Sequence, residues 1–246
     1  MTGPQMALPL DKKASRMLEI YNQQSFKSPR SAQRLRFTLV MWVIRSKITS
    51  GLKRPLDVAI ASLALLVFGP IMLATALLVK WTSPGPALFK QTRVGKWGEP
   101  FTCYKFRSMY IDAEQRKAEL MAENEADGPV FKMKNDPRIT PVGRYIRKLS
   151  IDELPQLLNV IKGDMSLVGP RPAVPKEVAQ YEYDQRRRLD AIPGITGLQQ
   201  VSGRSNLDFK RWVELDLEYI ANQSLLKDIE ILLKTIPAVL FSKGAY

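Results

Sequence analysis

Residues 58–79 read VAIASLALLVFGPIMLATALLV, a run of 22 residues without a charged side chain. At about 1.5 Å per residue, a helix of this length extends about 33 Å, which is enough to cross the hydrocarbon core of a bilayer. Buried helices of soluble domains are seldom uncharged over such a length. The run therefore predicts a membrane helix, and a buried helix in a soluble domain is the alternative.

Gly69-Pro70 lies at the middle of this run and divides it into halves, each about one leaflet deep. Proline removes a main-chain donor and kinks a helix. Both flanks of the run are basic, with Lys53 and Arg54 before it and Lys80, Lys90, Arg93 and Lys96 after it. Positive residues remain on the cytoplasmic side, so two basic flanks favour a re-entrant helix hairpin. A helix that simply spans the bilayer stays open as the alternative.

The chain of 246 residues contains no histidine, a single cysteine (Cys103) and a formal net charge of +13. The absence of histidine excludes Ser-His-Asp and Cys-His catalysis and HExxH zinc sites. One cysteine excludes an intrachain disulfide and a cysteine zinc cluster. An enzyme of this composition would use carboxylates, lysine, arginine, hydroxyls or an oxygen-bound cation such as Mg²⁺. The positive charge implies an anionic partner, which is nucleic acid, acidic lipid or a phosphorylated substrate.

The remaining sequence predicts a mainly α fold with a small β element. Short apolar stretches within residues 87–109 predict a β-hairpin. Helices are expected over about 112–125, 151–162 and 172–190. Apolar residues recur from Leu225 to Leu240 at helical spacing, which predicts a helix that either faces the core or lies on the membrane.

Asp152 and Glu153 are adjacent carboxylates after a basic stretch, and they fall in the first turn of a predicted helix. Unpaired N–H groups and the helix dipole stabilise anions there and attract phosphate. A carboxylate kept ionised beside arginines can attack phosphorus or bind magnesium. The alternative is structural, because Ser150 and Glu153 have the spacing of a capping box. Pro155 would be poorly tolerated beyond the first turn, so the start of the helix is open.

Two loops and one short basic cluster could bind phosphate. In Gly169-Pro170-Arg171-Pro172, two prolines hold Arg171 in a rigid turn, and a fixed guanidinium suits bidentate phosphate binding. Residues 193–204 contain four glycine or arginine positions typical of a loop that approaches phosphate closely: Gly194, Gly197, Gly203 and Arg204. Lys105-Phe106-Arg107 is the basic cluster. An ordinary surface role is the alternative for each, and Arg186-Arg187-Arg188 is interpreted as a solvated helix face.

Four motifs occur in order along the chain: KFRSM at 105–109, SIDELPQ at 150–156, SLVGPRP at 166–172 and PGITG at 193–197. Together they resemble the catalytic core of the bacterial sugar transferases, also called monotopic phosphoglycosyl transferases. The resemblance covers residues from about 51 to 246 and lacks the four-helix membrane bundle of longer members. It implies an N-terminal extension (1–50), a re-entrant membrane helix (51–80) and a compact catalytic domain with interfacial helices (81–246). This domain would face the cytoplasm at the bacterial inner (cytoplasmic) membrane.

The resemblance also implies a reaction. Asp152 would attack the sugar-linked phosphate of a UDP-sugar and release UMP, and undecaprenyl phosphate would then attack the phosphosugar-enzyme. Asp152 would also bind Mg²⁺, with Glu153 as its catalytic partner. The phosphate-binding residues would be Lys105, Arg147 and Arg171, and further donor-site candidates are Gln200 and Arg204. The C-terminal region and the insertion between Met109 and Asp136 look most like members that start exopolysaccharide repeats with UDP-glucose or UDP-galactose.

Two other functions remain as alternatives. One is a membrane-anchored basic protein that binds nucleic acid or acidic lipid without catalysis. This function would need only the positive charge and the apolar run. It would not need the Asp-Glu pair and the Gly-Pro-Arg-Pro motif to occur together in this order. The other is a catalytically silent scaffold of the same fold, which the retention of both acidic residues disfavours. The resemblance therefore predicts a UDP-sugar, undecaprenyl phosphate and the membrane as partners, and no nucleic acid. It leaves the oligomeric state open.

Overall fold

The structure is a computed structural model, and it describes residues 29–120, 124–125, 128–131, 133, 135–203 and 207–240. The chain divides into two compact units, Met1–Pro55 and Leu56–Tyr246. The boundary between them falls inside helix α2 (Pro29–Thr82). The hairpin, the short helices and the candidate site described below all belong to the second unit.

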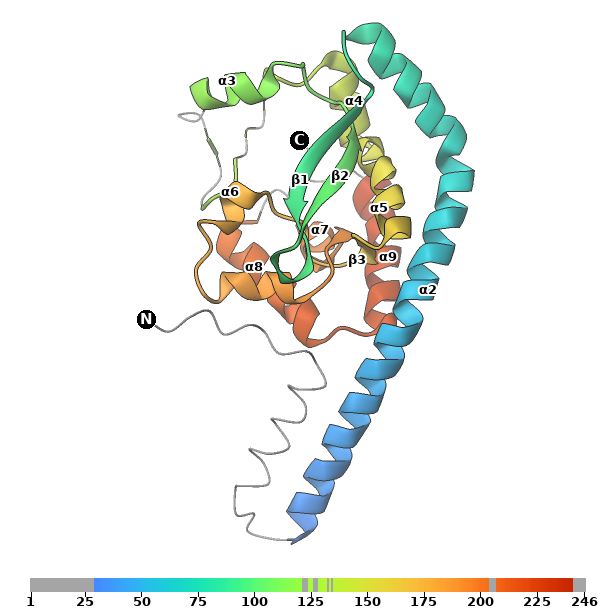
Figure 1. Ribbon diagram of the computed structural model, residues 1–246, viewed down its shortest axis with the longest axis vertical. Helices are drawn as coiled ribbons and strands as arrows, with labels where there is room; N and C mark the ends of the chain where they lie inside the picture. Colours follow the sequence, from blue (N-terminus) through green and yellow to red (C-terminus); the bar gives the residue numbers. More distant parts are fainter. Residues whose placement is uncertain are drawn as a thin grey trace. The chain divides into compact units, whose positions relative to one another are not determined.

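Helix α2 is continuous through Gly69-Pro70. Figure 1 shows residues 56–82 as one curved helix that does not turn back on itself, so the structure does not contain the expected hairpin. Proline removes one main-chain hydrogen bond, and a helix can absorb that loss by bending. The helix also begins at Pro29, well before the expected boundary at residue 51.

The apolar part of α2 is exposed rather than enclosed by protein. From Gly51 to Thr82 the helix is long and apolar enough to cross a membrane, with a mean hydropathy of 2.3. Only 11% of its most apolar stretch is buried within the protein. Leu66 and Leu73 are 77% and 65% exposed. An exposed apolar surface of this size disfavours the alternative of a buried helix in a soluble domain.

Polar contacts attach the second half of α2 to the rest of its unit. The main-chain N–H of Leu167 donates to Asp57 Oδ1 over 3.3 Å. At the other end, Arg107 donates to the carbonyl oxygens of Ser83, over 2.8 Å, and of Pro84. Helix C-termini leave carbonyl groups unpaired, and a guanidinium can satisfy several of them. Arg107 therefore binds the end of α2, and the basic cluster at residues 105–107 contributes only Lys105 to the candidate site.

The β-hairpin that was expected within residues 87–109 is confirmed. Strands β1 (Leu88–Val94) and β2 (Pro100–Phe106) pair antiparallel across the short 3₁₀ helix η1 (Lys96–Gly98). Phe89 pairs with Lys105 and Arg93 pairs with Phe101. Side chains alternate along a strand, so this register places Arg93, Cys103 and Lys105 on the same face of the hairpin.

Short elements make up most of the remaining fold. They are α3 (Ala113–Glu119), α4 (Pro141–Lys148), η3 (Ile151–Gln156), α5 (Leu157–Lys162), β3 (Ser166–Val168), α6 (Pro175–Val178), η4 (Gln185–Asp190), β4 (Gly194–Thr196), α7 (Leu198–Ser202), α8 (Phe209–Ala221) and α9 (Leu225–Leu240). Helix α9 confirms the C-terminal prediction, and α3 is shorter than expected. A single helix over 172–190 is wrong, because this region forms α6 and η4 with a non-helical stretch between them. The buried ion pair of Arg188 with Asp216 fixes η4 against α8, a long-range contact that local helix propensity does not include.

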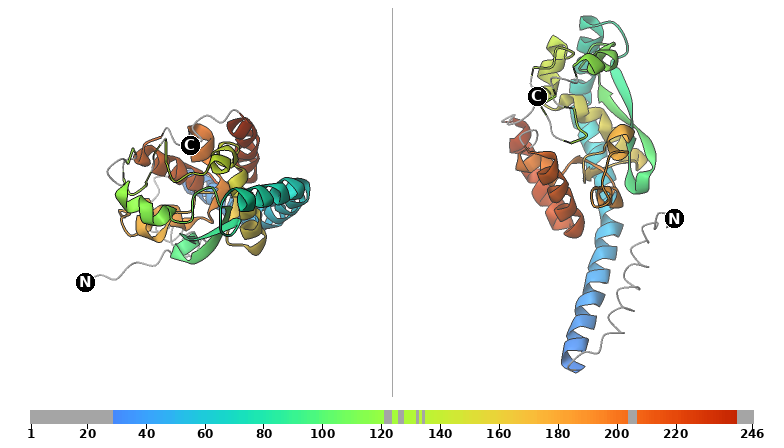
Figure 2. Two further views of the ribbon diagram at one scale, coloured as in Figure 1. Left: turned by 90° about the horizontal axis from the view of Figure 1, so that it is seen from above. Right: turned by 90° about the vertical axis from the view of Figure 1, so that its left-hand side faces the viewer.

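A pair of short parallel strands organises the core. Ser166 of β3 pairs with Gly194 of β4, and Val168 pairs with Thr196. The loop after β3 packs tightly on β4, since a Cβ atom on Gly169 would lie 2.3 Å from the Ile192 carbonyl oxygen. The two motifs at 166–172 and 193–197 are therefore in direct main-chain contact. Helix α9 packs on this pair, and Figure 2 shows the C-terminal helices (orange to dark red) on the other side of the unit from the β1–β2 hairpin (green).

Candidate active site

The Asp152-Glu153 pair lies in the first turn of the 3₁₀ helix η3. Ser150, the residue before it, has left-handed φ/ψ of 55° and 20°, and its side chain makes no capping hydrogen bond. The capping-box interpretation is therefore wrong, because an N-cap serine needs an extended conformation to reach the helix N–H groups. Pro155 lies inside η3, before α5 begins at Leu157, so it breaks no α-helical hydrogen bond. The Glu153 side chain is left to interact with other groups.

Glu153 binds two of the predicted cations. Its Oε1 atom accepts a hydrogen bond from Lys105 Nζ over 2.7 Å and one from Arg171 Nη1 over 3.1 Å. Burial raises the pKa of the Glu153 carboxyl, but the charges of Lys105 and Arg171 outweigh burial and hold this pKa well below its usual range. Glu153 therefore stays ionised, and its contacts with Lys105 and Arg171 connect strand β2 to the Gly-Pro-Arg-Pro loop.

Asp152 has the opposite electrostatic character. Its side chain is buried, and burial raises its pKa to about 6. The charge of Lys105 opposes that rise, the charge of Glu153 adds to it, and Arg147 and Arg171 oppose it more weakly. Above about pH 6 the Asp152 carboxylate is ionised but poorly solvated, which favours nucleophilic attack.

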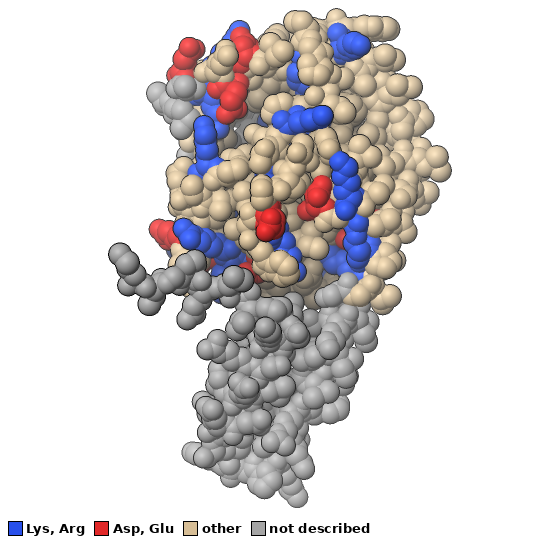
Figure 3. Space-filling view, viewed as in Figure 1, with Lys and Arg blue, Asp and Glu red and all other residues tan. Residues whose placement is uncertain are grey.

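The structure brings the predicted cations around this pair. Lys105 and Arg171 contact Glu153, and Arg147 at the end of α4 is close enough to lower the pKa of Asp152. Figure 3 shows basic and acidic side chains interspersed over the face that carries the β1–β2 hairpin, so the clustering of positive charge is local to the carboxyl pair. Clustered positive charge of this kind suits a ligand that carries several phosphate charges.

Gln200, a donor-site candidate of the Gly-rich loop, contacts its own turn rather than the Asp152-Glu153 pair. Gln200 lies on α7, and its Nε2 atom donates to the Ile195 carbonyl over 3.5 Å. Its Oε1 atom is buried without a hydrogen-bond partner in the part of the chain that the structure describes. Gln200 therefore contacts the β4–α7 turn, and Arg204 lies outside the described residues.

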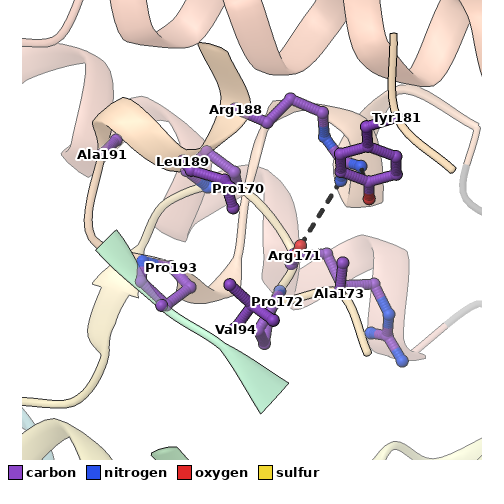
Figure 4. Close-up of a pocket in the computed structure, with 11 residues that line it drawn as sticks. Val94, Pro170, Arg171, Pro172, Ala173, Tyr181, Arg188, Leu189, Ala191 and Pro193 are labelled. Atoms are coloured by element: carbon purple, nitrogen blue, oxygen red, sulfur yellow. Dashed lines mark hydrogen bonds between the residues drawn. The ribbon is translucent and has the colours of Figure 1, made fainter. Parts of the chain in front are cut away.

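The interpretation of Arg188 as part of a solvated helix face is wrong. Arg188 is 4% exposed, and its Nε donates to Asp216 Oδ2 over 2.8 Å. It also donates to the Tyr181 hydroxyl over 2.5 Å and to the Arg171 carbonyl over 3.4 Å. Figure 4 shows this last contact, at the edge of a small pocket beneath the loop. One signal was available, since Asp216 falls on the apolar face of α8 with Val213, where a buried acid needs a cation.

The comparison with protein families agrees with this geometry. The family described as bacterial sugar transferase matches residues 48–242. The chain belongs to this family. The match includes the apolar half of α2 and every residue of the candidate site.

Relatives of this sugar transferase have related descriptions. Galactosyl transferase CpsE of Streptococcus agalactiae is 50% identical over 194 residues, which are 78% of this chain and 43% of CpsE. Exopolysaccharide production protein ExoY of Rhizobium meliloti is 44% identical over 198 residues, 79% of this chain and 88% of ExoY. UDP-glucose:undecaprenyl-phosphate glucose-1-phosphate transferase of Caulobacter vibrioides is 42% identical over 204 residues, 79% of this chain and 72% of the relative. This sugar transferase thus spans less than half the length of CpsE.

The donor atoms of the sugar transferase site suit one hard cation shared with a substrate. The described residues contain no group of three or more acidic, histidine or cysteine side chains that could hold a metal ion alone. Magnesium commonly needs only one or two carboxylates, with waters and substrate phosphates as its other ligands. Glu153 Oε1 is already bound by two cations, so the Asp152 carboxylate is the better ligand.

Proposed function

We propose that this chain transfers a hexose-1-phosphate from a UDP-sugar to undecaprenyl phosphate and releases UMP. This reaction would be the first membrane step in the assembly of an exopolysaccharide or another glycoconjugate. The observation that carries the proposal is the division of roles between adjacent carboxyls. Asp152 is buried with a pKa of about 6, whereas Glu153 is held ionised by Lys105 and Arg171. Pairs whose environments separate their pKa values are typical of active sites.

In the first step, a carboxylate oxygen of Asp152 attacks the sugar-linked phosphorus of the donor. The bond from this phosphorus to the oxygen shared with the UMP phosphate breaks, and UMP leaves with the electron pair. Lys105 and Arg171 each give one N–H to Glu153, and within the described residues their side chains make no other hydrogen bond, so further donors could bind phosphoryl oxygens. Their charges stabilise the negative charge that grows on the leaving phosphate.

In the second step, an oxygen of undecaprenyl phosphate attacks the phosphorus of the aspartyl phosphosugar. The bond to Asp152 breaks, the carboxylate is restored and the lipid carries the sugar in a diphosphate linkage. Glu153 keeps Lys105 and Arg171 in position through both steps, because its low pKa makes it a poor proton acceptor. Magnesium, bound by Asp152, would supply further positive charge for the phosphates.

The membrane arrangement supports the same reaction. We propose that the apolar part of α2 enters the cytoplasmic leaflet and returns, so that both its ends and the catalytic domain face the cytoplasm. Basic residues at both flanks support this arrangement, which requires a sharper bend at Gly69-Pro70 than the continuous helix of the structure has. Helix α9 adds an exposed apolar stripe suited to the interface: Leu226, Ile229, Leu233 and Ile236. One nucleophile could then reach both a soluble nucleotide sugar and a lipid head group.

The direct test is incubation of membranes containing the protein with undecaprenyl phosphate and a panel of UDP-sugars. We expect release of UMP and formation of a sugar-diphosphate lipid. A basic anchor protein that binds nucleic acid or acidic lipid would release no UMP with any donor. Such a result, with protein shown to be folded, would overturn the proposal.

A further inference from the structure

Arg93 on strand β1 is a largely buried cation that forms no salt bridge with any acidic side chain of the described residues. Its Nη1 atom donates to the Pro172 carbonyl over 2.8 Å. Its Nε atom is buried and has no hydrogen-bond partner within the described part of the chain. Burial lowers the pKa of this guanidinium, and the nearby charge of Arg171 lowers it further, whereas Glu177, Cys103 and Glu153 act in the opposite direction more weakly. The site thus contains two guanidinium groups that repel each other.

The hairpin register directs Arg93 toward the carboxyl pair. Arg93, Cys103 and Lys105 share one face of the hairpin, and Lys105 on that face contacts Glu153. The buried Cys103 thiol is close enough to Lys105 and Arg93 to interact with their charges, and it interacts also with Glu153 and Arg171. Arg93 therefore lies in the same charged cluster as the residues already placed in the site.

A main-chain bridge fixes Arg93 beside the Arg171 loop. The N–H of Val94 donates to the Ala173 carbonyl over 2.9 Å, which makes a short antiparallel bridge. Figure 4 shows Val94 beside Pro172 and Ala173. Together with the bond from Arg93 to Pro172, this bridge holds the two guanidinium-bearing segments side by side.

A structural role alone does not account for the charge. A neutral donor could satisfy the Pro172 carbonyl, and a buried guanidinium without a counter-ion is strongly unfavourable. The bond to Pro172 uses Nη1, so the edge formed by Nε and Nη2 is left for an anion. That edge presents two parallel N–H donors, the geometry that phosphate oxygens accept.

We propose that Arg93 binds phosphoryl oxygens of the donor's diphosphate together with Arg171. This inference rests on the proposed function, since it identifies a further donor-binding residue of the same site. Lys105 and Arg171 are shared with Glu153, whereas Arg93 contributes a charge that no carboxylate of the described residues neutralises through an ion pair. The donor would supply the missing negative charge.

The test measures binding of UDP, which carries the diphosphate but is not a sugar donor, to the full-length protein in detergent. Arg93→Gln should weaken UDP binding by about tenfold or more, the effect of losing a hydrogen bond to a charged group. The UDP affinity of Arg93→Lys should lie between those of Arg93→Gln and the unaltered protein, because lysine keeps the charge but not the planar edge of the guanidinium. Lys90→Gln is the matched control, since Lys90 is exposed on the opposite face of the same strand. Its UDP affinity should equal that of the unaltered protein.

Further measurements separate binding from folding and from the overall reaction. Thermal unfolding without ligand shows whether Arg93→Gln is folded, and if it is not, Arg93→Lys decides the result. Unchanged UDP affinity in the folded Arg93 variant, or an equal loss in Lys90→Gln, would overturn the inference. If the unaltered protein binds UDP through Arg93 but transfers no sugar phosphate, the proposed function fails and the diphosphate site stands. If it transfers sugar phosphate and Arg93→Gln has an unchanged donor KM, the inference alone fails.

Discussion

Arg188 Nε donates to Asp216 Oδ2 over 2.8 Å, and both side chains are almost completely buried. Through its other nitrogens, Arg188 reaches the Tyr181 hydroxyl and the Arg171 carbonyl. The ion pair between η4 and α8 therefore supports the main chain of the residue whose guanidinium binds Glu153. Burial raises the pKa of Asp216 to about 6, and Arg188 opposes that rise, so the pair is fully charged only above this pH.

Asp216→Asn should destabilise the protein at pH 8, because it leaves Arg188 buried without its counter-ion. Loss of one partner of a buried pair costs about 3–5 kcal/mol, which for a chain of this size lowers Tm by at least about 6 °C. Thermal unfolding in detergent measures the change. Arg187→Gln, at the exposed neighbouring position, should leave Tm within about 2 °C. Equal Tm values for the two variants would contradict a structural role for the ion pair.

Asp152→Asn should remain folded and lose turnover, because an amide cannot form the acyl phosphate. Incubation with donor alone, followed by intact-mass analysis, should show a phosphosugar adduct on the unaltered protein only. The isosteric change removes the buried charge, so Tm should not fall. Near-normal turnover by this variant would exclude Asp152 as the nucleophile.

The rate of the first UMP release should rise with pH through about 6, since only the ionised form of Asp152 attacks. Lys105 lowers the pKa of Asp152. In Lys105→Met the rise of the rate with pH should therefore occur at higher pH, and the reaction should also be slower. Single-turnover measurements from pH 5 to pH 8 would show both effects. If the rate of Lys105→Met rises at the same pH as that of the unaltered protein, the titrating group is not Asp152, and Asp216 would be the first candidate.

Cysteines at Leu52 and Lys80, in a Cys103→Ala background, should react with a membrane-impermeant reagent from the same side. Both positions are exposed in the structure, and both flanks are basic. Labelling of intact and opened cells compares the two sides. Labelling from opposite sides would establish a helix that spans the bilayer, and Pro70→Ala should favour that form because it restores the missing main-chain donor.

UDP-glucose or UDP-galactose should be preferred over UDP-N-acetylglucosamine when all three compete at equal concentration. This expectation follows the family resemblance, and an acetamido group would need extra room and its own hydrogen-bond partners. Mass analysis of the lipid products resolves the three sugars. A dominant N-acetylated product would contradict the hexose preference while leaving the transfer reaction intact.

Local patterns predicted the parts of the molecule that local forces determine. The β1–β2 hairpin follows from its short apolar stretches, and α9 follows from its apolar periodicity. The structure places Lys105 and Arg171 against Glu153, and the phosphate-binding roles that the motifs implied for them stay predictions. Long-range contacts decided the rest. Ser150 adopts a left-handed conformation in place of the expected cap, and the buried pair of Arg188 with Asp216 fixes η4 against α8 where one longer helix was predicted. Neither effect is visible in a short stretch of sequence.

The turn of the β1–β2 hairpin is an unsuitable place for a tag or label, although it is exposed. Trp97 at its tip is 62% exposed, which would ordinarily mark a tolerant position for an epitope tag or a fluorescent label. The strands on either side, however, carry Arg93 and Lys105, and Val94 is bonded to the Arg171 loop. An insertion that shifted the register by one residue would turn these side chains to the other face. Tagging at this surface position should therefore damage the enzyme as severely as a change in its interior.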